Sequence, residues 1–215
     1  MKERPLIFTG ESVRAILAGT KIQTRRLLKL PPTERAILRI VPAVGSDGSL
    51  WDAEGDDDKG LVWHSIACPY GVAGDYLWVR EPWRTRLDQD HIAPRDLDPR
   101  WTHPTWIADY PDITPSGCGG GVGRLRPARF LPRAFSRISL ELTDVRVQRL
   151  RDIGASDIAA EGVSVEHGHQ ESHTGEACSD CALAFADRWD SINAKRGYSW
   201  DSNPWVWALT FRRLP

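Results

Sequence analysis

Polar residues of chemically useful types crowd a short stretch near the start of the chain. Directly after an apolar segment that ends at Gly19, the sequence "GTKIQTRR" places a lysine, a threonine and two arginines within six positions, namely Lys21, Thr24, Arg25 and Arg26. An arginine guanidinium is planar, pairs bidentately with phosphate and stacks on nucleobases. This composition is typical either of a solvated loop or of one wall of a site that binds an anion or a nucleobase.

A second group of cationic residues occupies residues 124–137. Five arginines fall within fourteen positions that contain no Asp or Glu, namely Arg124, Arg126, Arg129, Arg133 and Arg137. Together with Arg25, Arg26 and a tryptophan such as Trp78 or Trp83, this segment has the composition to follow a phosphate backbone and stack bases. The alternative is that these arginines pair with some of the 29 acidic residues, or cover apolar surface with their stems.

The sequence "WVRE" also allows either a binding role or a structural ion pair. Arg80 and Glu81 stand at the end of an expected strand, where they face the site or are held in ion pairs. Arg137 is the expected partner of Glu81. We favour the structural ion pair, and keep both residues as candidates for substrate or nucleic-acid binding.

A third group combines histidine and cysteine in residues 166–181, "EHGHQESHTGEACSDC". A Cys-x-x-Cys pair with a histidine nearby suits a tetrahedral zinc ion that closes a loop. The candidate ligands of such a structural zinc are His173, Cys178 and Cys181. The spacing departs from common zinc-finger patterns, and the alternative is a polar loop that is rich in these residue types.

Composition restricts the class of protein. The chain has 215 residues, enough for one domain with a sizeable core, and a formal net charge of −1, so any electrostatic surface must be local. Of its 28 basic residues, 23 are arginine. The start has no apolar stretch of signal-peptide length, and no later segment is apolar enough to span a bilayer. We expect a cytoplasmic protein that does not contact membranes.

Capping residues and alternation indicate the elements that carry the first group. Thr9 is a suitable N-cap for a first helix, and Gly19 is a suitable left-handed stop. Alternation over residues 21–26 then predicts a strand. One side of that strand carries Ile22, Thr24 and Arg26, and the other carries Gln23 and Arg25.

The rest of the chain predicts further short strands and a few short helices. Residues 52–60, "DAEGDDDKG", predict an acidic loop, and residues 154–162 predict a short helix that ends at Gly162. Residues 182–193 predict a helix with Phe185, Trp189 and Ile192 on one face. Other strands are expected over residues 4–8, 36–44, 74–81, 136–150 and 203–214. This pattern favours an α+β fold built around a small mixed barrel.

Five segments of the chain resemble the ASCH family of the PUA-like superfamily. They are "ILAGTKIQTRR", "GDYLWVRE", "LPRAFSRISLELTDVRV", "IAAEGV" and "WDSINAKRGYSWDSNPWVWALTF". The likeness to the longer ASCH proteins of phages and prophages covers most of the chain. Similarity to the compact bacterial ASCH enzymes that hydrolyse N4-acetylcytidine is confined to the first helix and strand, "GDYLWVRE", "IAAEG" and the last strand.

The resemblance implies one domain over residues 1–215, a PUA-like β-barrel flanked by short helices, with loop insertions near residues 45–70, 84–125 and 164–181. It also implies a cleft suited to a nucleobase or a nucleic acid, and no required cofactor. The amidohydrolase members use a lysine, a threonine and a glutamate. Carried over to the matching positions, this set is Lys21, Thr24 and Glu161.

Two mechanisms are open for this set. In one, Lys21 with a lowered pKa takes the proton of the Thr24 hydroxyl, which attacks an acyl carbon. In the other, Glu161 activates a water, Lys21 stabilises the oxyanion and Thr24 only binds. Residues three apart point to opposite faces of a regular strand, so a joint role requires Lys21 to precede the strand or a bulge to intervene.

Three functions therefore compete. The first is an amidohydrolase that removes an acyl group from a modified cytidine such as N4-acetylcytidine. The second is a module that binds RNA or DNA without turnover, and the third is a ribonuclease, which is weakened because no histidine falls in the matching segments. Whether the chain is an enzyme, its exact substrate, and its oligomeric state are left open by the residues alone.

Overall fold

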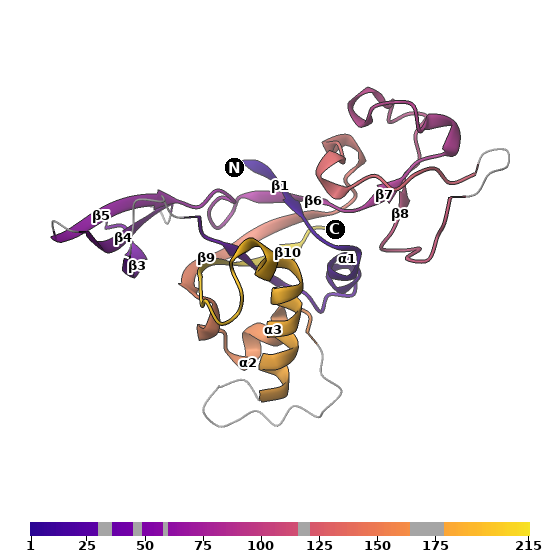
Figure 1. Cartoon of the computed structure of the whole chain (residues 1–215). Helices are drawn as coiled ribbons and strands as arrows, with labels where there is room; N and C mark the ends of the chain where they lie inside the picture. The colour runs from indigo at the N-terminus through magenta and orange to yellow at the C-terminus, as the bar shows by residue number, and fades with distance from the viewer. Residues whose placement is uncertain (30–35, 45–48, 58–59, 116–120, 164–178) are drawn as a thin grey trace. The chain divides into compact units, whose positions relative to one another are not determined.

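The computed structural model describes residues 1–29, 36–44, 49–57, 60–115, 121–163 and 179–215 (Figure 1). These residues form a mixed α+β fold, as the sequence predicts. The chain divides into two compact units, each assembled from distant segments of sequence. The first unit consists of Met1–Gly19, Asp75–Glu141 and Arg213–Pro215, and the second consists of Thr20–Gly74 and Leu142–Arg212.

The largest sheet has five strands in the order β1-β6-β9-β10-β2. Their bounds are β1 Glu3–Ile7, β6 Tyr76–Arg80, β9 Ser139–Arg149, β10 Trp205–Arg213 and β2 Gln23–Leu27. Among the described residues, the strand pairs do not close this sheet into a barrel. The strand pairs therefore show the α+β fold but not the expected PUA-like barrel.

In the first unit, β6 pairs in parallel with β1 and antiparallel with the start of β9. Helix α1 (Gly10–Leu17) begins as predicted, because the Thr9 hydroxyl accepts a hydrogen bond from the Ser12 N–H at 3.2 Å. It buries Val13 and Ile16. Gly19 follows with a φ of +76°, in the left-handed region that glycine adopts without strain.

The segment between β6 and β9 in the first unit has little regular structure among its described residues. Strands β7 (Trp83–Arg84) and β8 (Thr105–Trp106) pair antiparallel, and the other described residues there form mostly turns and single 3-10 turns. A small apolar core supports it, formed by Trp83, Leu97, Leu131 and Phe135.

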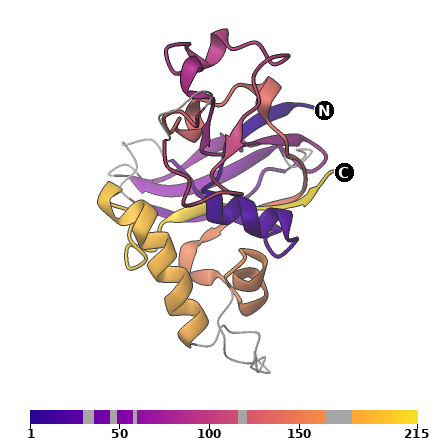
Figure 2. The same ribbon diagram turned by 90° about the vertical axis from the view of Figure 1, so that its right-hand side faces the viewer.

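In the second unit, β10 pairs antiparallel with β2 in regular register, with Leu209 opposite Thr24. Helices α2 (Ala155–Ala160) and α3 (Ser179–Asn193) lie side by side (Figure 2). Their contact belongs to the core of this unit. That core consists of Leu150, Ile153, Ile158, Val163, Cys181, Phe185, Trp189 and Val206.

The predicted acidic loop at residues 52–60 is wrong. The structure has strands there, in an antiparallel sheet of β3 (Ala36–Pro42), β4 (Leu50–Asp57) and β5 (Gly60–Ala67). The carboxylates alternate with small or apolar residues, so one side of β4 is buried at Trp51 and Ala53. On the other side Asp52 accepts a hydrogen bond from Ser65, and Glu54 pairs with Arg39.

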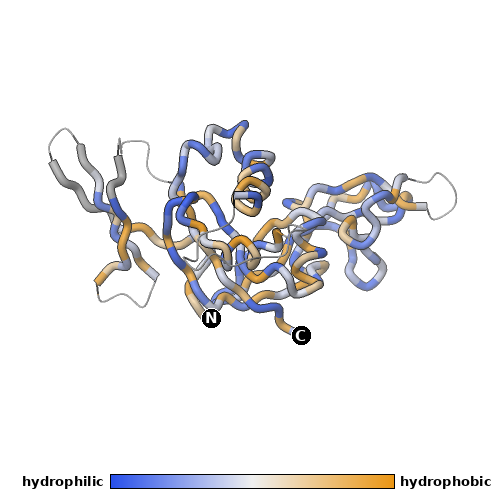
Figure 3. Tube along the Cα trace, turned by 90° about the horizontal axis from the view of Figure 1, so that it is seen from below, coloured by the Kyte–Doolittle hydropathy of each residue, from blue (hydrophilic) through white to orange (hydrophobic). Residues whose placement is uncertain are grey.

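Helix α3 corrects a second expectation. Phe185 and Trp189 are buried as predicted, but Ile192 is 53% exposed and Asn193 is buried in its place. The Asn193 amide donates to the Trp189 carbonyl oxygen at 3.2 Å, which satisfies the buried polar group. Figure 3 shows hydrophobic and hydrophilic residues succeeding one another along the chain, as amphipathic elements require. None of the described helices is long and apolar enough to cross a membrane.

Candidate functional site

The end of α2 joins the segment just ahead of β2 in the second unit. Lys21 and Glu161 form an isolated antiparallel β-bridge, and the Ile22 N–H donates to the Ala160 carbonyl oxygen at 2.8 Å. Glu161 is the C-cap residue of α2, and Gly162 follows with a φ of +73°. The predicted glycine stop therefore places the glutamate where the helix ends, against the backbone of Lys21.

The two side chains also meet. The Lys21 Nζ atom donates to Glu161 Oε2 at 2.5 Å and to the Glu161 carbonyl oxygen at 2.8 Å. Only 3% of the Lys21 side chain and 7% of the Glu161 side chain are exposed. The second carboxylate oxygen of Glu161 accepts from Arg25 Nη1 at 3.3 Å. The Glu161 carboxylate thus contacts two buried cations, and a buried charge needs such a partner in order to be tolerated.

Burial lowers the pKa of Lys21, because the ammonium form loses its hydration. Glu161 raises that pKa, whereas Arg188 and Arg26 lower it further. The net direction is downward, so a larger fraction of Lys21 is a neutral amine than in a solvated lysine. A neutral amine has the lone pair that proton abstraction requires.

A polar network positions Arg25 beside this pair. Arg25 Nη2 lies 2.6 Å from Asp157 Oδ2, and its Nη1 donates to Gln23 Oε1 at 2.7 Å. Gln23 and Arg146 donate to Asp157 as well, at 3.1 and 3.2 Å. Burial by itself raises the pKa of Asp157, but Arg25, Gln23 and Arg146 together bring that pKa below its ordinary value. Asp157 is therefore an anion that fixes Arg25.

The structure does not bring Thr24 to the pair. Strand β2 begins at Gln23, so Lys21 precedes the strand, as a joint role with Thr24 requires. However, the side chains of Lys21 and Arg25 both reach Glu161, and Gln23 and Arg25 both reach Asp157. Alternation in the regular β2–β10 register then places Thr24 on the opposite face of β2. Its side chain is buried there.

By alternation, Arg26 lies on the same side of β2 as Thr24. Its positive charge nevertheless acts on the Lys21–Glu161 pair. Burial lowers the pKa of Arg26, and Tyr70 and Glu161 raise it. Arg26 in turn lowers the pKa of Lys21. Of the two arginines that the sequence assigns to substrate binding, Arg25 is held in the network and Arg26 supplies positive charge near the pair.

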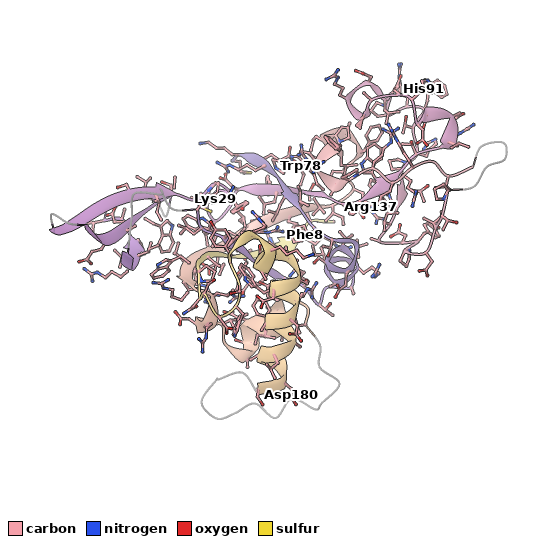
Figure 4. The ribbon with its side chains drawn as sticks, viewed as in Figure 1. Phe8, Lys29, Trp78, His91, Arg137 and Asp180 are labelled. Carbon is pink, nitrogen blue, oxygen red and sulfur yellow. The ribbon has the colours of Figure 1, made fainter. Side chains whose placement is uncertain are left out.

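In the first unit, the ion pair favoured for Glu81 is present. Arg137 donates to both carboxylate oxygens of Glu81, at 2.9 and 3.1 Å, and to both oxygens of Asp109, at 2.7 and 2.9 Å. Arg137, which Figure 4 labels, also lies 4.8 Å from the ring centroid of Trp106. Burial raises the pKa of Glu81, which is 1% exposed. Four of the five Arg137 N–H groups are thus engaged in structural contacts.

The arginines of residues 124–137 divide between structural and exposed roles. Arg126 is buried and donates to the carbonyl oxygens of Gln89 and Ile92, at 2.8 and 3.0 Å. Arg133 pairs with Glu3 at 2.5 Å. Arg124 and Arg129 form no ion pair with any of the described residues. The alternative stated for this segment therefore holds for Arg126, Arg133 and Arg137.

Two of the three candidate zinc ligands, His173 and Cys178, lie outside the described residues. The third, Cys181, is buried on α3 and packs in the apolar core of the second unit. Within the described part of the chain, no group of three or more His, Cys, Asp or Glu side chains is arranged to hold a metal ion.

Gln23, Asp157 and Arg146 belong to this network but were not predicted as site residues from the sequence. A signal was available for Asp157, because residues 157 and 161 are four apart and share one face of a helix. A period of two links Lys21, Gln23 and Arg25 in the same way. Comparisons with family models, curated proteins and solved structures gave no match to this chain.

Proposed function

We propose that this protein is an amidohydrolase that removes the acyl group from an N-acylated cytidine such as N4-acetylcytidine, with Lys21 and Glu161 at its catalytic centre. The observation that carries the proposal is the buried contact of 2.5 Å between Lys21 Nζ and Glu161 Oε2. These two residues come from "GTKIQT" and "IAAEG", segments that resemble the ASCH amidohydrolases. The same resemblance supports assigning the α+β fold to the PUA-like superfamily.

Hydrolysis of an exocyclic amide requires a nucleophile, a proton carrier and positive charge near the oxyanion. Neutral Lys21 accepts a proton from a water, whose oxygen forms a bond to the acyl carbon. Breakdown of the tetrahedral intermediate cleaves the bond from carbon to N4, and the Lys21 ammonium returns the proton to the departing nitrogen. The products are a carboxylic acid and cytidine, and Lys21 ends as it began.

The neighbouring residues support this cycle. Glu161 holds Lys21 in place and favours the ammonium that forms transiently. Arg25 donates a hydrogen bond to the Glu161 carboxylate and orients it, and Arg26 adds positive charge near Lys21. Because Thr24 lies on the opposite face of β2 from Arg25, water is a better candidate for the nucleophile than the Thr24 hydroxyl.

The test is release of acetate and cytidine from N4-acetylcytidine by the native chain and four variants. Lys21→Met and Glu161→Gln are expected to lower kcat/KM by about a hundredfold or more, the range of a lost general base. Thr24→Val is expected to retain most of the activity. Lys29→Met, which changes an exposed lysine beyond β2, is the matched control and leaves the rate unchanged.

Circular dichroism on each variant separates lost chemistry from lost folding. Absence of turnover by the folded native chain would overturn the proposal for this substrate. Inactivation by Thr24→Val in a folded variant would instead make the threonine hydroxyl the nucleophile.

A further inference from the structure

The first unit carries arginines and aromatic rings that the proposed hydrolysis does not use. On β6, Leu77 and Val79 point into the core, with 0% and 1% of their surface exposed. Alternation places Trp78, which Figure 4 labels, on the other face of the strand. Arg80 shares this alternation. On β1 the residues opposite these two are Pro5 and Ile7, and Ile7 is exposed. This face of the first unit is opposite to Leu77 and Val79, and Trp78 on it is only 7% exposed because other side chains cover it.

Arginine side chains cover this face. The guanidinium carbons of Arg80 and Arg133 lie 4.5 and 5.8 Å from the ring centroid of Trp78. Arg80 Nη1 also donates to the Arg129 carbonyl oxygen at 3.1 Å. Arg129 in turn lies 4.7 Å from the ring centroid of Phe130, which is 49% exposed. We call these five residues the arginine–aromatic patch.

The charge of the patch is unbalanced. Arg133 pairs with Glu3 and lowers the pKa of that carboxyl through a hydrogen bond. Among the residues that the structure describes, Arg80 and Arg129 form no ion pair. Three positive charges therefore face one negative charge. Two guanidinium groups lie near one indole ring. Their positive charges repel each other, and a bound anion reduces this repulsion.

We propose that the arginine–aromatic patch binds single-stranded nucleic acid, with Arg80 and Arg129 on backbone phosphates and a base stacked on the exposed ring of Phe130. Stacked aromatic rings beside a track of positive charge are the means by which proteins hold single strands without reading sequence. An acidic peptide also offers negative charge, but it offers no succession of planar rings. This site lies in the first unit and does not depend on the hydrolysis proposed for the second.

Binding is measured by fluorescence anisotropy with labelled oligouridylate and oligothymidylate, using the full chain. The Arg80→Gln/Arg129→Gln double variant is expected to raise Kd by about tenfold or more and to make the slope of log K against log salt shallower by about 1.4, as expected for two lost phosphate contacts. Phe130→Ala is expected to raise Kd by about tenfold through lost stacking, without changing that slope.

The matched control is Arg95→Gln/Arg151→Gln, which removes the same charge from exposed positions outside the patch and is expected to leave Kd nearly unchanged. Binding of either oligonucleotide with this pattern supports the proposal. The proposal is overturned if the native chain does not bind at low salt, if the control loses as much affinity as the patch variant, or if polyglutamate binds with the same dependence on the patch. Because the readout is binding alone, it is independent of N4-acetylcytidine hydrolysis.

Discussion

Glu161 lies between two cations, with Oε2 at 2.5 Å from Lys21 Nζ and Oε1 at 3.3 Å from Arg25 Nη1. The three side chains are almost completely buried. Glu161 is the carboxylate that pairs with Lys21, whereas Arg25 is also paired with Asp157, and uncompensated charge is costly in this environment. Glu161 contacts two cations, whereas the carboxylate that Lys21 contacts in this pair is that of Glu161. Loss of Glu161 and loss of Lys21 should therefore lower the free energy of unfolding by different amounts.

Glu161→Gln is expected to destabilise the protein more than Lys21→Met. Removing the carboxylate leaves the buried Lys21 ammonium without its anion, at a cost of about 3–5 kcal/mol, whereas Arg25 keeps its pair with Asp157. Removing the lysine leaves Glu161 paired with Arg25, and the cost falls to about 1 kcal/mol. Urea denaturation of the two variants measures both values. A larger loss for Lys21→Met would mean that the pair is not organised around the carboxylate.

Hydrolysis is expected to increase with pH through the pKa of Lys21 in the folded protein. That pKa lies below 10.5, because burial disfavours the ammonium, and the neutral amine is the active form. Arg188 lowers this pKa, so Arg188→Gln should raise it and displace the profile of kcat/KM to higher pH. Activity that falls as the pH rises, or a displacement to lower pH in the variant, would contradict Lys21 as the base.

The two carboxylates that hold Arg137 are expected to differ in their contribution to stability. Glu81 is 1% exposed, whereas the Asp109 side chain is 36% exposed. Glu81→Ala leaves Arg137 without its buried partner and should cost about 3 kcal/mol, the lower end of the range for a broken buried pair. Asp109→Ala should cost less than about 1 kcal/mol, as for exposed pairs. Equal losses in thermal or urea unfolding would disprove this ranking.

Cys181 is expected to act through packing in the core of the second unit. Cys181→Ala removes a buried sulfur from contact with Phe185 and Trp189 and should cost about 1–2 kcal/mol as a small cavity. The loss should be the same with and without a strong chelator in the unfolding experiment. A chelator that lowers the stability of the native chain to that of the variant would instead identify Cys181 as a metal ligand.

The sequence by itself determined the local features of this protein. Thr9 begins α1, Gly19 and Gly162 end α1 and α2, and a period of two places Gln23 and Arg25 on one side of β2. These features depend on backbone conformation and on neighbours within a few residues, so residue type and spacing are sufficient to predict them. The ion pair of Glu81 and Arg137 was also expected from the sequence, and the structure confirms it.

Only the tertiary structure decided which distant groups meet and which are buried. Lys21 and Glu161 are 140 residues apart, and their contact depends on how α2 docks beside β2. The same holds for β4, whose carboxylate-rich residues form a strand because β3 and β5 pair with it on both sides. It also holds for Ile192, whose exposure is set by where α3 packs. Burial and pairing are properties of the assembled core, and no local pattern encodes them alone.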